Sequence, residues 1–499
     1  MQSFIGRTSE LAALRDRCDR PGFQMAVVYG RRRVGKTTLI NRFIDDCGCK
    51  AVSFVALQRG EKEQLALMGN AVLGALAPQM LDSVSFETFE RLFTFVAQAA
   101  QSERVILLID EYPYLAAACP YMNSLIQRFV DHEWKGTQLY LILCGSLVSF
   151  MRDDVVGECA PLHGRSTLEL KLHPMGYRDS GEFVPGYTHE EKAIVYGLTG
   201  GVPKYLEQFD DAKSLDQNIV EQFYSGTGYF TEEQIQSLVT ADRANPAAFN
   251  SVLMAIASGH TKYSEIATCT GMNDIAYYMR TLVALELVEK RSSGGRPYYV
   301  IADPMVAFWF KYVSPAASLI NAGRGELYYE RRVRGRLHEH MGPVFEAMAR
   351  QWCFENMGTE RFPFFATGIE EYQASVKVPG EQPRQVELNL VGRDGKGIAF
   401  VGECKFRGEA FGSAELRKLT DKVALLPARD PGIVVFSLGG FSDEVRASGA
   451  TLVGIEEMYE GGARGSLADF APTSQDPTRL DAEKSAFRKA MVIKHADAS

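Results

Sequence analysis

Three groups of residues have the types and spacing needed for chemistry on phosphates. The first is the stretch GRRRVGKTT at residues 30–38, which contains the pattern Gly-x-x-x-x-Gly-Lys-Thr. Its glycines let backbone N–H groups turn toward phosphate oxygens, its lysine reaches the β- and γ-phosphates, and its threonine hydroxyl binds Mg²⁺. A chance match in a glycine-rich loop is the alternative. The predicted nucleotide site comprises Gly30, Arg31, Arg32, Arg33, Val34, Gly35, Lys36, Thr37 and Thr38, with Lys36 catalytic and Thr37 also a metal ligand.

The second group is an acidic pair, in which the apolar stretch of RVILLIDEY (residues 104–112) runs into Asp110 and Glu111. We expect Asp110 to hold Mg²⁺ through water and Glu111 to orient and deprotonate an attacking water. An acidic pair after a strand can also be only a helix cap. Ser146 ends a further apolar stretch and is either a γ-phosphate sensor or a plain turn serine. No Asn-Lys-x-Asp pattern for guanine occurs, so ATP is the expected nucleotide.

The third group lies in VELNLVGRDGKGIAFVGECKF, residues 386–406. Glu387 and Asn389 are two residues apart, as are Glu403 and Lys405, so each pair shares one face of a strand. Cleavage of a phosphodiester needs a divalent metal held by carboxylates and a cation that stabilises the transition state. We therefore expect Glu387, Asn389 and Glu403 as metal ligands, with Glu403 and Lys405 in catalytic roles.

Asn389 weakens this third site, because an intact site would have aspartate there and a neutral amide is a poorer ligand for Mg²⁺. Glu387 and Glu346, the latter on a predicted helix, are the carboxylates that can compensate. Reduced or lost cleavage is therefore favoured over full activity. A strand pair with an incidental salt bridge is the structural alternative.

These residues need particular elements to position them. A buried strand at 25–29 before the glycine loop, and helical spacing of Leu39, Ile40 and Phe43 after it, match the strand–loop–helix order that the motif requires. The predicted fold class is α/β, with a P-loop NTPase parallel-sheet core at residues 1–180 and a helical lid at 181–243. Residues 244–313 show three helices and a strand pair, the order of a winged helix. Its strand pair carries Lys290, Arg291 and Arg296, which can contact phosphates, but protein docking is an equal alternative.

A resemblance follows from several of these segments. The chain resembles the predicted AAA+ (STAND-related) ATPases of archaea and bacteria in FIGR at residues 4–7, in the glycine loop and in LLIDEY. It also matches in CGSLVSFM, HGRSTLELKLHPM and TGGVPKYL, all in the family's order over the first 210 residues. The resemblance implies that FIGR borders the adenine pocket and that Pro203 approaches the nucleotide from the lid. It also implies that Arg165 is a sensor or trans arginine, with a surface salt bridge as the alternative.

The same resemblance bears on the C-terminal part. Proteins of this family often carry a restriction-endonuclease-like PD-(D/E)XK domain there, and GECKF is the matching segment. A helix at 342–356, a strand pair at 386–391 and 398–405, a helix at 413–426 and strands at 432–437 and 450–458 fit such an α/β domain. We place it at residues 325–465, followed by a tail at 466–499 that becomes helical near 480–492.

Composition limits the class of protein. The chain of 499 residues is too long for one core, and it has no apolar run of 18 residues and no signal-peptide core. Nine cysteines follow no zinc spacing, and the nearest pair, Cys47 and Cys49, is interpreted as incidental, so we expect a reducing cytoplasmic environment. The net charge of −8 excludes a protein wholly coated in nucleic acid but allows a local basic surface.

We therefore expect an ATP-binding and ATP-hydrolysing switch, with ATP and Mg²⁺ as cofactors. It would couple its nucleotide state to nucleic-acid engagement through a weak or degenerate nuclease-like domain. One alternative is an active, ATP-gated, metal-dependent DNA endonuclease, and another is a non-enzymatic signalling scaffold that binds protein partners. Double-stranded DNA, a protein partner and a second copy of the chain stay open as partners, and no membrane contact is expected.

Overall fold

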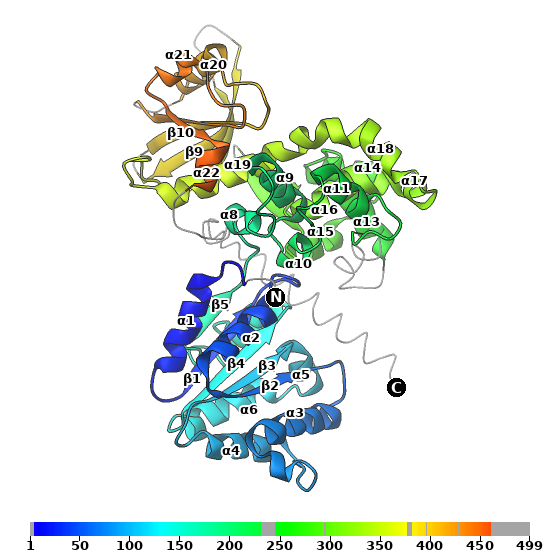
Figure 1. Cartoon of the computed structure of the whole chain (residues 1–499), viewed down its shortest axis with the longest axis vertical. Coiled ribbons are helices and arrows are strands. Elements are labelled where there is room, and N and C mark those ends of the chain that lie inside the picture. The colour runs from blue at the N-terminus through cyan, green and yellow to red at the C-terminus, as the bar shows by residue number, and fades with distance from the viewer. Residues whose placement is uncertain are drawn as a thin grey trace. The chain divides into compact units, whose positions relative to one another are not determined.

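The computed structural model describes residues 4–230, 245–293, 296–376, 382–395, 397–426 and 430–460. The chain divides into two compact units, an N-terminal unit of Gly6–His173 and a C-terminal unit that begins at Pro174 (Figure 1). The predicted helical tail at 480–492 lies outside the described residues. None of the described helices is long and apolar enough to cross a membrane.

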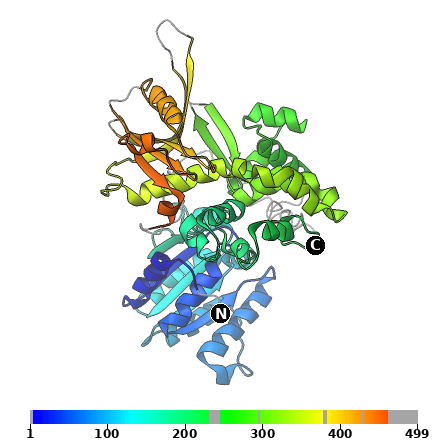
Figure 2. The same cartoon turned by 45° about the horizontal axis from the view of Figure 1, so that its top comes forward.

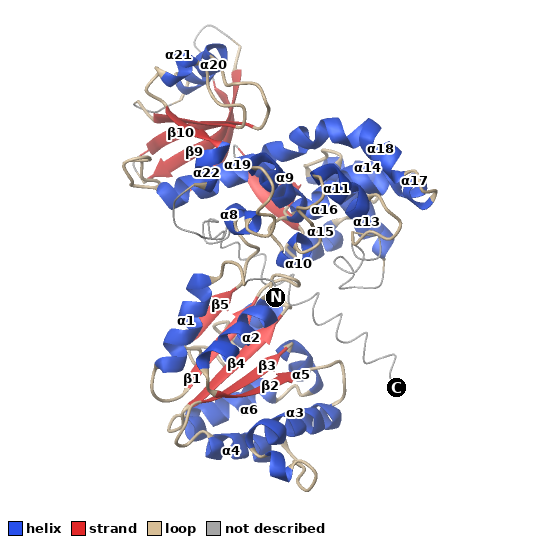
Figure 3. Cartoon of the chain, in the orientation of Figure 1, coloured by secondary structure: helices blue, strands red, loops and turns tan. Residues whose placement is uncertain are grey.

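The N-terminal unit is built on a sheet of five parallel strands in the order β2-β3-β4-β1-β5 (Figure 3). These strands are β1 (Gln24–Tyr29), β2 (Lys50–Val55), β3 (Val105–Asp110), β4 (Leu139–Gly145) and β5 (Leu168–Lys171). Strands β1, β3 and β4 are buried along their whole length, which explains why they read as continuous apolar runs. The predicted parallel-sheet core is confirmed.

Helices cover both faces of this sheet. One face carries α1 (Thr8–Asp19) and α2 (Lys36–Cys47), and Phe43 of α2 packs edge-on against Tyr140 of β4. The other face carries α3 (Glu61–Leu76), α4 (Phe89–Ala99), α5 (Tyr112–Ala118) and α6 (Met122–Phe129). Alternate residues of β1 point to opposite faces, and Met25 and Val27 join the second cluster.

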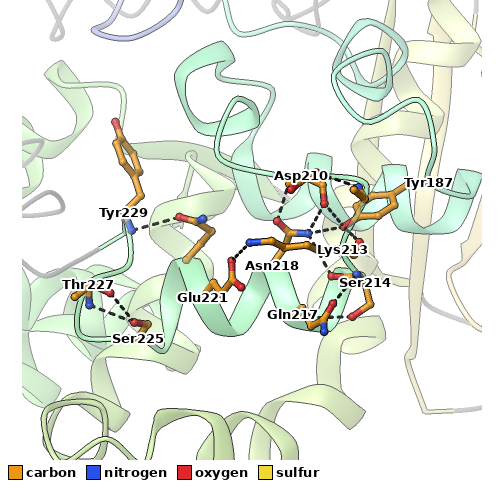
Figure 4. A network of polar contacts seen from close by, with 12 residues as sticks. Tyr187, Asp210, Lys213, Ser214, Gln217, Asn218, Glu221, Ser225, Thr227 and Tyr229 are labelled. Carbon is orange, nitrogen blue, oxygen red and sulfur yellow. Dashed lines mark hydrogen bonds and ion pairs between the residues drawn. The ribbon is translucent and has the colours of Figure 1, made fainter.

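The C-terminal unit starts with helices α8 (Tyr177–Gly181), α9 (His189–Thr199), α10 (Pro203–Leu206) and α11 (Leu215–Phe223). Ser214 and Gln217 form a capping box at the start of α11. The buried Asn218 amide connects this helix to the preceding loop (Figure 4). It donates to the Tyr187 hydroxyl and to the Asp210 carbonyl, both at 2.7 Å, and accepts from the Asp210 N–H at 2.9 Å.

The predicted order of three helices and a strand pair is present. Helices α13 (Pro246–Ala257), α14 (Tyr263–Thr270) and α15 (Ala276–Ala284) precede the antiparallel hairpin of β6 (Val288–Ser293) and β7 (Arg296–Ile301). Arg291 of this hairpin pairs with a carboxylate of the last sheet instead of projecting into solvent. Its Nη1 lies 3.1 Å from a carboxylate oxygen of Glu371, which also accepts from the Tyr298 hydroxyl at 3.2 Å. The hairpin packs on strand β8 (Gly368–Val376), and phosphate contact by Arg291 stays a prediction.

The chain then continues through α16 (Pro304–Phe308), α17 (Ala317–Asn321) and α18 (Gly325–Tyr328) to the long helix α19 (Leu337–Asn356). Helix α19 starts five residues before its predicted beginning at 342. It packs on strands β9 (Arg384–Asp394) and β10 (Gly397–Lys405), and Figure 2 gives a second view of this layer.

The last sheet is mixed and has the order β12-β11-β10-β9-β8. Strands β8, β9 and β10 run antiparallel, whereas β10, β11 (Gly432–Ser437) and β12 (Thr451–Gly454) run parallel. Helix α20 (Ser413–Val423) contributes Leu419 to a separate apolar cluster with Val386 and Val435. Strand β8 was not predicted, because its polar residues show no buried apolar face. The predicted strand at 450–458 divides into β12 and helix α22 (Ile455–Tyr459).

Candidate functional site

The glycine loop joins the carboxyl end of β1 to the start of α2, as the motif requires. Gly30 is needed for space, because a Cβ there would lie 2.2 Å from the Leu172 carbonyl oxygen. The Lys36 ammonium donates to the carbonyl oxygens of Gly30 at 2.9 Å and Arg31 at 3.0 Å. Burial lowers the pKa of Lys36, and nearby Glu111 and Asp110 act in the opposite direction. The loop therefore holds a buried ammonium where phosphates would bind.

Thr37 and Asp110 meet at the carboxyl edge of the sheet. The Thr37 hydroxyl donates to Asp110 Oδ2 at 2.8 Å, and the Glu111 N–H donates to the other carboxylate oxygen at 2.9 Å. A hydroxyl and a buried carboxylate in contact are oxygen ligands of the kind that Mg²⁺ prefers, so the residues present fit the ion. When bound with a nucleotide, Mg²⁺ neutralises charge on the β- and γ-phosphates.

Glu111 and Ser146 form a pair that the sequence did not connect. The Ser146 hydroxyl donates to both carboxylate oxygens of Glu111, at 3.0 and 2.8 Å. Strand β4 lies between β3 and β1, so Ser146 follows a strand that separates Glu111 from the glycine loop. Glu111 has φ +51°, a left-handed conformation that is rare for glutamate and is often retained at functional sites. The serine therefore fixes the orientation of the carboxylate.

Arg7, in the FIGR segment, also contacts the loop and was not predicted as a site residue. Its guanidinium donates to the Val34 carbonyl oxygen at 3.1 Å, to the His173 carbonyl oxygen and to Glu10 at 2.8 Å. This buried side chain ties the start of α1 to the glycine loop. The family resemblance placed FIGR beside the adenine pocket, but no signal in the sequence predicts this contact between Arg7 and the glycine loop.

Arg165 lies away from the glycine loop. Its guanidinium forms a two-pronged salt bridge with Asp131, at 3.0 and 2.7 Å, and it precedes β5. Thr167 pairs with Met25 at the start of β1, whereas the loop follows the end of β1, roughly 15 Å away along the strand. This position does not favour a sensor role within the same chain, and the sensor and trans roles both stay predictions.

Three further residues of the predicted nucleotide site lie in different elements. Arg32 donates to the Tyr114 hydroxyl at 3.2 Å, and Thr38 lies in the first turn of α2. Pro203 belongs to the C-terminal unit, where it begins α10.

In the C-terminal unit, Asn389 is bound at both ends of its amide. Its Nδ2 donates to Glu346 of α19 at 2.6 Å, and its Oδ1 accepts from the Cys404 N–H of β10 at 3.0 Å. Two residues of β9, Asn389 and Leu390, lie between Leu388 and Val391, opposite the single residue Glu371 of β8, so Asn389 belongs to a bulge. Burial, together with the charges of Glu371 and Glu403, raises the pKa of Glu346 to about 7.

Glu403 and Lys405 lie beside this amide. The Lys405 ammonium donates to Glu403 Oε1 at 2.7 Å, and the Lys422 ammonium lies 3.7 Å from the other oxygen. Glu387 does not join them, since it is exposed and accepts a hydrogen bond from Gln373 of β8. Within the described ranges, no three carboxylates bring their oxygens within 4.8 Å of one another. Among the described contacts, none joins Glu387 to Asn389 or Glu403, so the three predicted ligands do not form one contacting group, and the metal site stays a prediction.

Two parts of the chain are similar to known protein families. Residues 4–209 match the model of an ATPase domain found predominantly in Archaea, and residues 309–419 match a family of archaeal and bacterial proteins of unknown function. An uncharacterized protein of Methanocaldococcus jannaschii is 28% identical over 371 residues, which cover 72% of this chain and 80% of that protein.

Solved structures with some similarity include a Walker-type ATPase of Pyrococcus abyssi, with 18% identity and a TM-score of 0.46. That alignment covers 62% of this chain and 96% of the other. The Aeropyrum pernix ORC2 protein aligns over 65% of this chain and 97% of its own, with 13% identity and a TM-score of 0.43. Residues 4–209 are therefore similar to an ATPase domain found predominantly in Archaea, and the geometry of the glycine loop and of Asp110 and Glu111 agrees with an ATPase.

Proposed function

We propose that this ATPase is a switch whose nucleotide state controls nucleic-acid engagement by the C-terminal unit, and that its nuclease-like site is disarmed. The proposal of a disarmed site rests on the Asn389 amide, whose Nδ2 and Oδ1 both form hydrogen bonds within the protein. An amide in this role stabilises the bulge of β9, whereas a carboxylate there would repel Glu346 and leave a charge for a metal ion.

The ATPase part of the proposal assigns roles to contacts in one cluster. Lys36 binds phosphate oxygens, Thr37 and Asp110 hold Mg²⁺, and Glu111 takes a proton from the attacking water. Ser146 keeps the Glu111 carboxylate in place through its two hydrogen bonds. A nucleotide that contacts these residues can alter the serine–glutamate pair, which is a local element with two possible arrangements.

The nucleic-acid part rests on the C-terminal sheet and its charges. Helix α19, the antiparallel strands β8, β9 and β10, helix α20 and the parallel strand β11 follow the element order expected of a nuclease-like core, with one further strand. Lys405 and Lys422, both about one-third exposed, lie on either side of Glu403. These ammonium groups are suited to bind a phosphate backbone without a metal ion.

The test is cleavage of supercoiled, linear and branched DNA with Mg²⁺ or Mn²⁺, with and without ATP. Wild type should not cut, and Asn389→Asp should gain metal-dependent cutting if only the carboxylate is missing. Cutting by wild type that Lys405→Ala abolishes would contradict the disarmed site and support an active endonuclease.

Salt-dependent DNA binding separates the switch from a protein scaffold. Wild type should bind double-stranded DNA with an affinity that falls as salt rises, and ATP should change that affinity. No DNA binding in any nucleotide state, together with no cleavage by the variants, would favour the scaffold.

A further inference from the structure

Three cysteines from separate elements converge in the N-terminal unit. Cys18 is near the end of α1, Cys47 is the last residue of α2, and Cys49 directly precedes β2. Their sulfur atoms all lie within 4.8 Å of one another, and Cys18 Sγ is 3.9 Å from Cys49 Sγ. Across the described residues, no other three cysteine, histidine or acidic side chains converge so closely. The sequence interpretation of Cys47 and Cys49 as incidental overlooked Cys18, because only the packing of α1 on α2 brings it there.

The spacing of these sulfur atoms matches that around a metal ion. Three thiolates bound to one ion at about 2.3 Å are separated by about 3.8 Å in tetrahedral geometry, and by slightly more in a plane. A disulfide needs about 2.05 Å between sulfur atoms, and all three cysteines are free thiols. The distance of 3.9 Å between Cys18 and Cys49 is therefore close to that of a shared ion.

The backbone around Cys47 and Cys49 orients both sulfur atoms and directs an N–H group at one of them. Gly48 has φ +66° and ends α2 in a left-handed turn, which directs Cys47 and Cys49 to the same side. The Cys49 N–H points at Cys47 Sγ, with 3.5 Å between nitrogen and sulfur. Hydrogen bonds of this kind orient ligands and stabilise negative charge on sulfur. Cys18 is buried, whereas the other two are half-buried, so an ion can enter from the Cys47–Cys49 side.

We propose that Cys18, Cys47 and Cys49 bind one thiophilic d¹⁰ cation, Zn²⁺ or Cu⁺, through three thiolates. Both ions favour thiolate ligands. Zn²⁺ would take water as its fourth ligand, whereas Cu⁺ would be three-coordinate. Each thiol releases its proton to solvent as its metal–sulfur bond forms, and no atom changes oxidation state.

The position of the site gives it a structural consequence. Helices α1 and α2 start beside the glycine loop, through Arg7 and Lys36, and both end at the cysteine cluster. A bound ion would connect these two helix ends to the start of β2. Because it binds the folded unit in preference to the unfolded chain, it would raise the melting temperature, and this rise would grow with the logarithm of the ion concentration divided by its dissociation constant.

The first measurement uses the full chain, reduced and freed of metal, and titrated with Co²⁺ as a spectroscopic substitute for Zn²⁺. We expect a thiolate-to-cobalt charge-transfer band that saturates at one equivalent and is lost when Zn²⁺ is added. A parallel titration with Cu⁺, against a coloured Cu⁺ chelator, determines which ion binds more tightly. In the double variant Cys47→Ser/Cys49→Ser, binding of both ions should weaken at least tenfold.

Cys159→Ser/Cys269→Ser is the matched control, because it removes two exposed cysteines outside the cluster and should bind like wild type. ATP turnover by each variant reports that the unit has folded, since none of these cysteines belongs to the catalytic cluster. The proposal is overturned if reduced wild type binds neither ion. It is equally overturned if the Cys47→Ser/Cys49→Ser protein binds as tightly as wild type.

Discussion

Glu111 shows how much of this protein's chemistry depends on single side chains. Its backbone is left-handed, its carboxylate accepts two hydrogen bonds from Ser146, and its neighbour Asp110 accepts one from Thr37. A carboxylate held this way is oriented before any substrate arrives, which lowers the cost of reaching the reactive geometry.

We expect Glu111→Gln to bind ATP normally and to lower the rate of hydrolysis by about 10²–10⁴-fold, because the amide cannot accept a proton. Ser146→Ala should cause a smaller loss, of about tenfold, since the carboxylate remains but is no longer held. Steady-state phosphate release and fluorescent-nucleotide binding measure both quantities. Ser83→Ala, in an exposed turn, is the control for Ser146→Ala. Equal turnover in Ser146→Ala and wild type would remove the positioning role.

Glu346 makes a pH prediction at the same scale. Its pKa is raised from 4.5 to about 7, chiefly by burial, so the folded state retains a proton that the unfolded state loses between these values. Stability should therefore fall as pH rises from 4.5 to 7, by up to about 3 kcal/mol at about 1.4 kcal/mol per pKa unit. Glu346→Gln should remove this slope in urea unfolding, whereas exposed Glu387→Gln should keep it. If wild type and Glu346→Gln showed the same change in stability over this pH range, the assignment of the slope to Glu346 would be contradicted.

Among the elements, helix α11 depends on a buried polar residue rather than on an apolar stripe alone. Asn218 satisfies both the N–H and the carbonyl oxygen of Asp210, and it also binds the Tyr187 hydroxyl (Figure 4). Strand β9 uses Asn389 in a comparable way, since its side chain replaces a ladder contact at the bulge. An amide suits both positions because it donates one hydrogen bond and accepts another at the same time.

Asn218→Ala should destabilise the C-terminal unit by about 1–3 kcal/mol, because it removes the hydrogen bonds that the buried amide makes with Asp210 and with the Tyr187 hydroxyl. Gln217→Ala, in the exposed capping box of the same helix, should cost about 1 kcal/mol or less. Chemical denaturation followed by circular dichroism compares the two variants. If the two losses were equal, the buried network would contribute no more than an ordinary helix cap.

For the whole molecule, the proposed function requires a surface of the C-terminal unit that binds nucleic acid. The β6–β7 hairpin, which in a winged helix would be open to DNA, has Arg291 paired with Glu371 of the last sheet. Lys405 and Lys422 place two positive charges on the last sheet and helix α20, next to Glu403. The proposed binding surface is therefore the mixed sheet rather than the hairpin.

We expect Lys405→Ala/Lys422→Ala to weaken binding of double-stranded DNA and to reduce the slope of log affinity against log salt by about 1–2. Arg291→Ala should leave that slope unchanged, because its single charge faces two carboxylates, Glu289 and Glu371. Lys405 and Lys422, in contrast, share the one carboxylate of Glu403. Fluorescence anisotropy over a range of salt concentrations measures both. A loss of slope confined to Arg291→Ala would move the binding surface to the hairpin.

The sequence by itself determined the features that are local in the chain. The glycine loop, the acidic pair and the strand–loop–helix order were readable because each is specified by adjacent residues and by the periodicity of burial. The parallel-sheet core, with Lys36, Thr37 and Asp110 at the ends of its elements, followed from these signals, whereas strands β2 and β5 were not predicted. The later helices and strands were also largely predictable, apart from the polar strand β8.

Only the tertiary structure decided which distant residues meet. The strand order places β4 between β1 and β3, and this joins Ser146 to Glu111 but leaves Arg165 at the far edge. The bulge in β9 converts Asn389 from a possible metal ligand into a structural amide. Helix packing brings Cys18 to Cys47 and Cys49. Strand order, bulges and helix contacts are set by long-range packing, which leaves no periodic signal in the residues that it brings together.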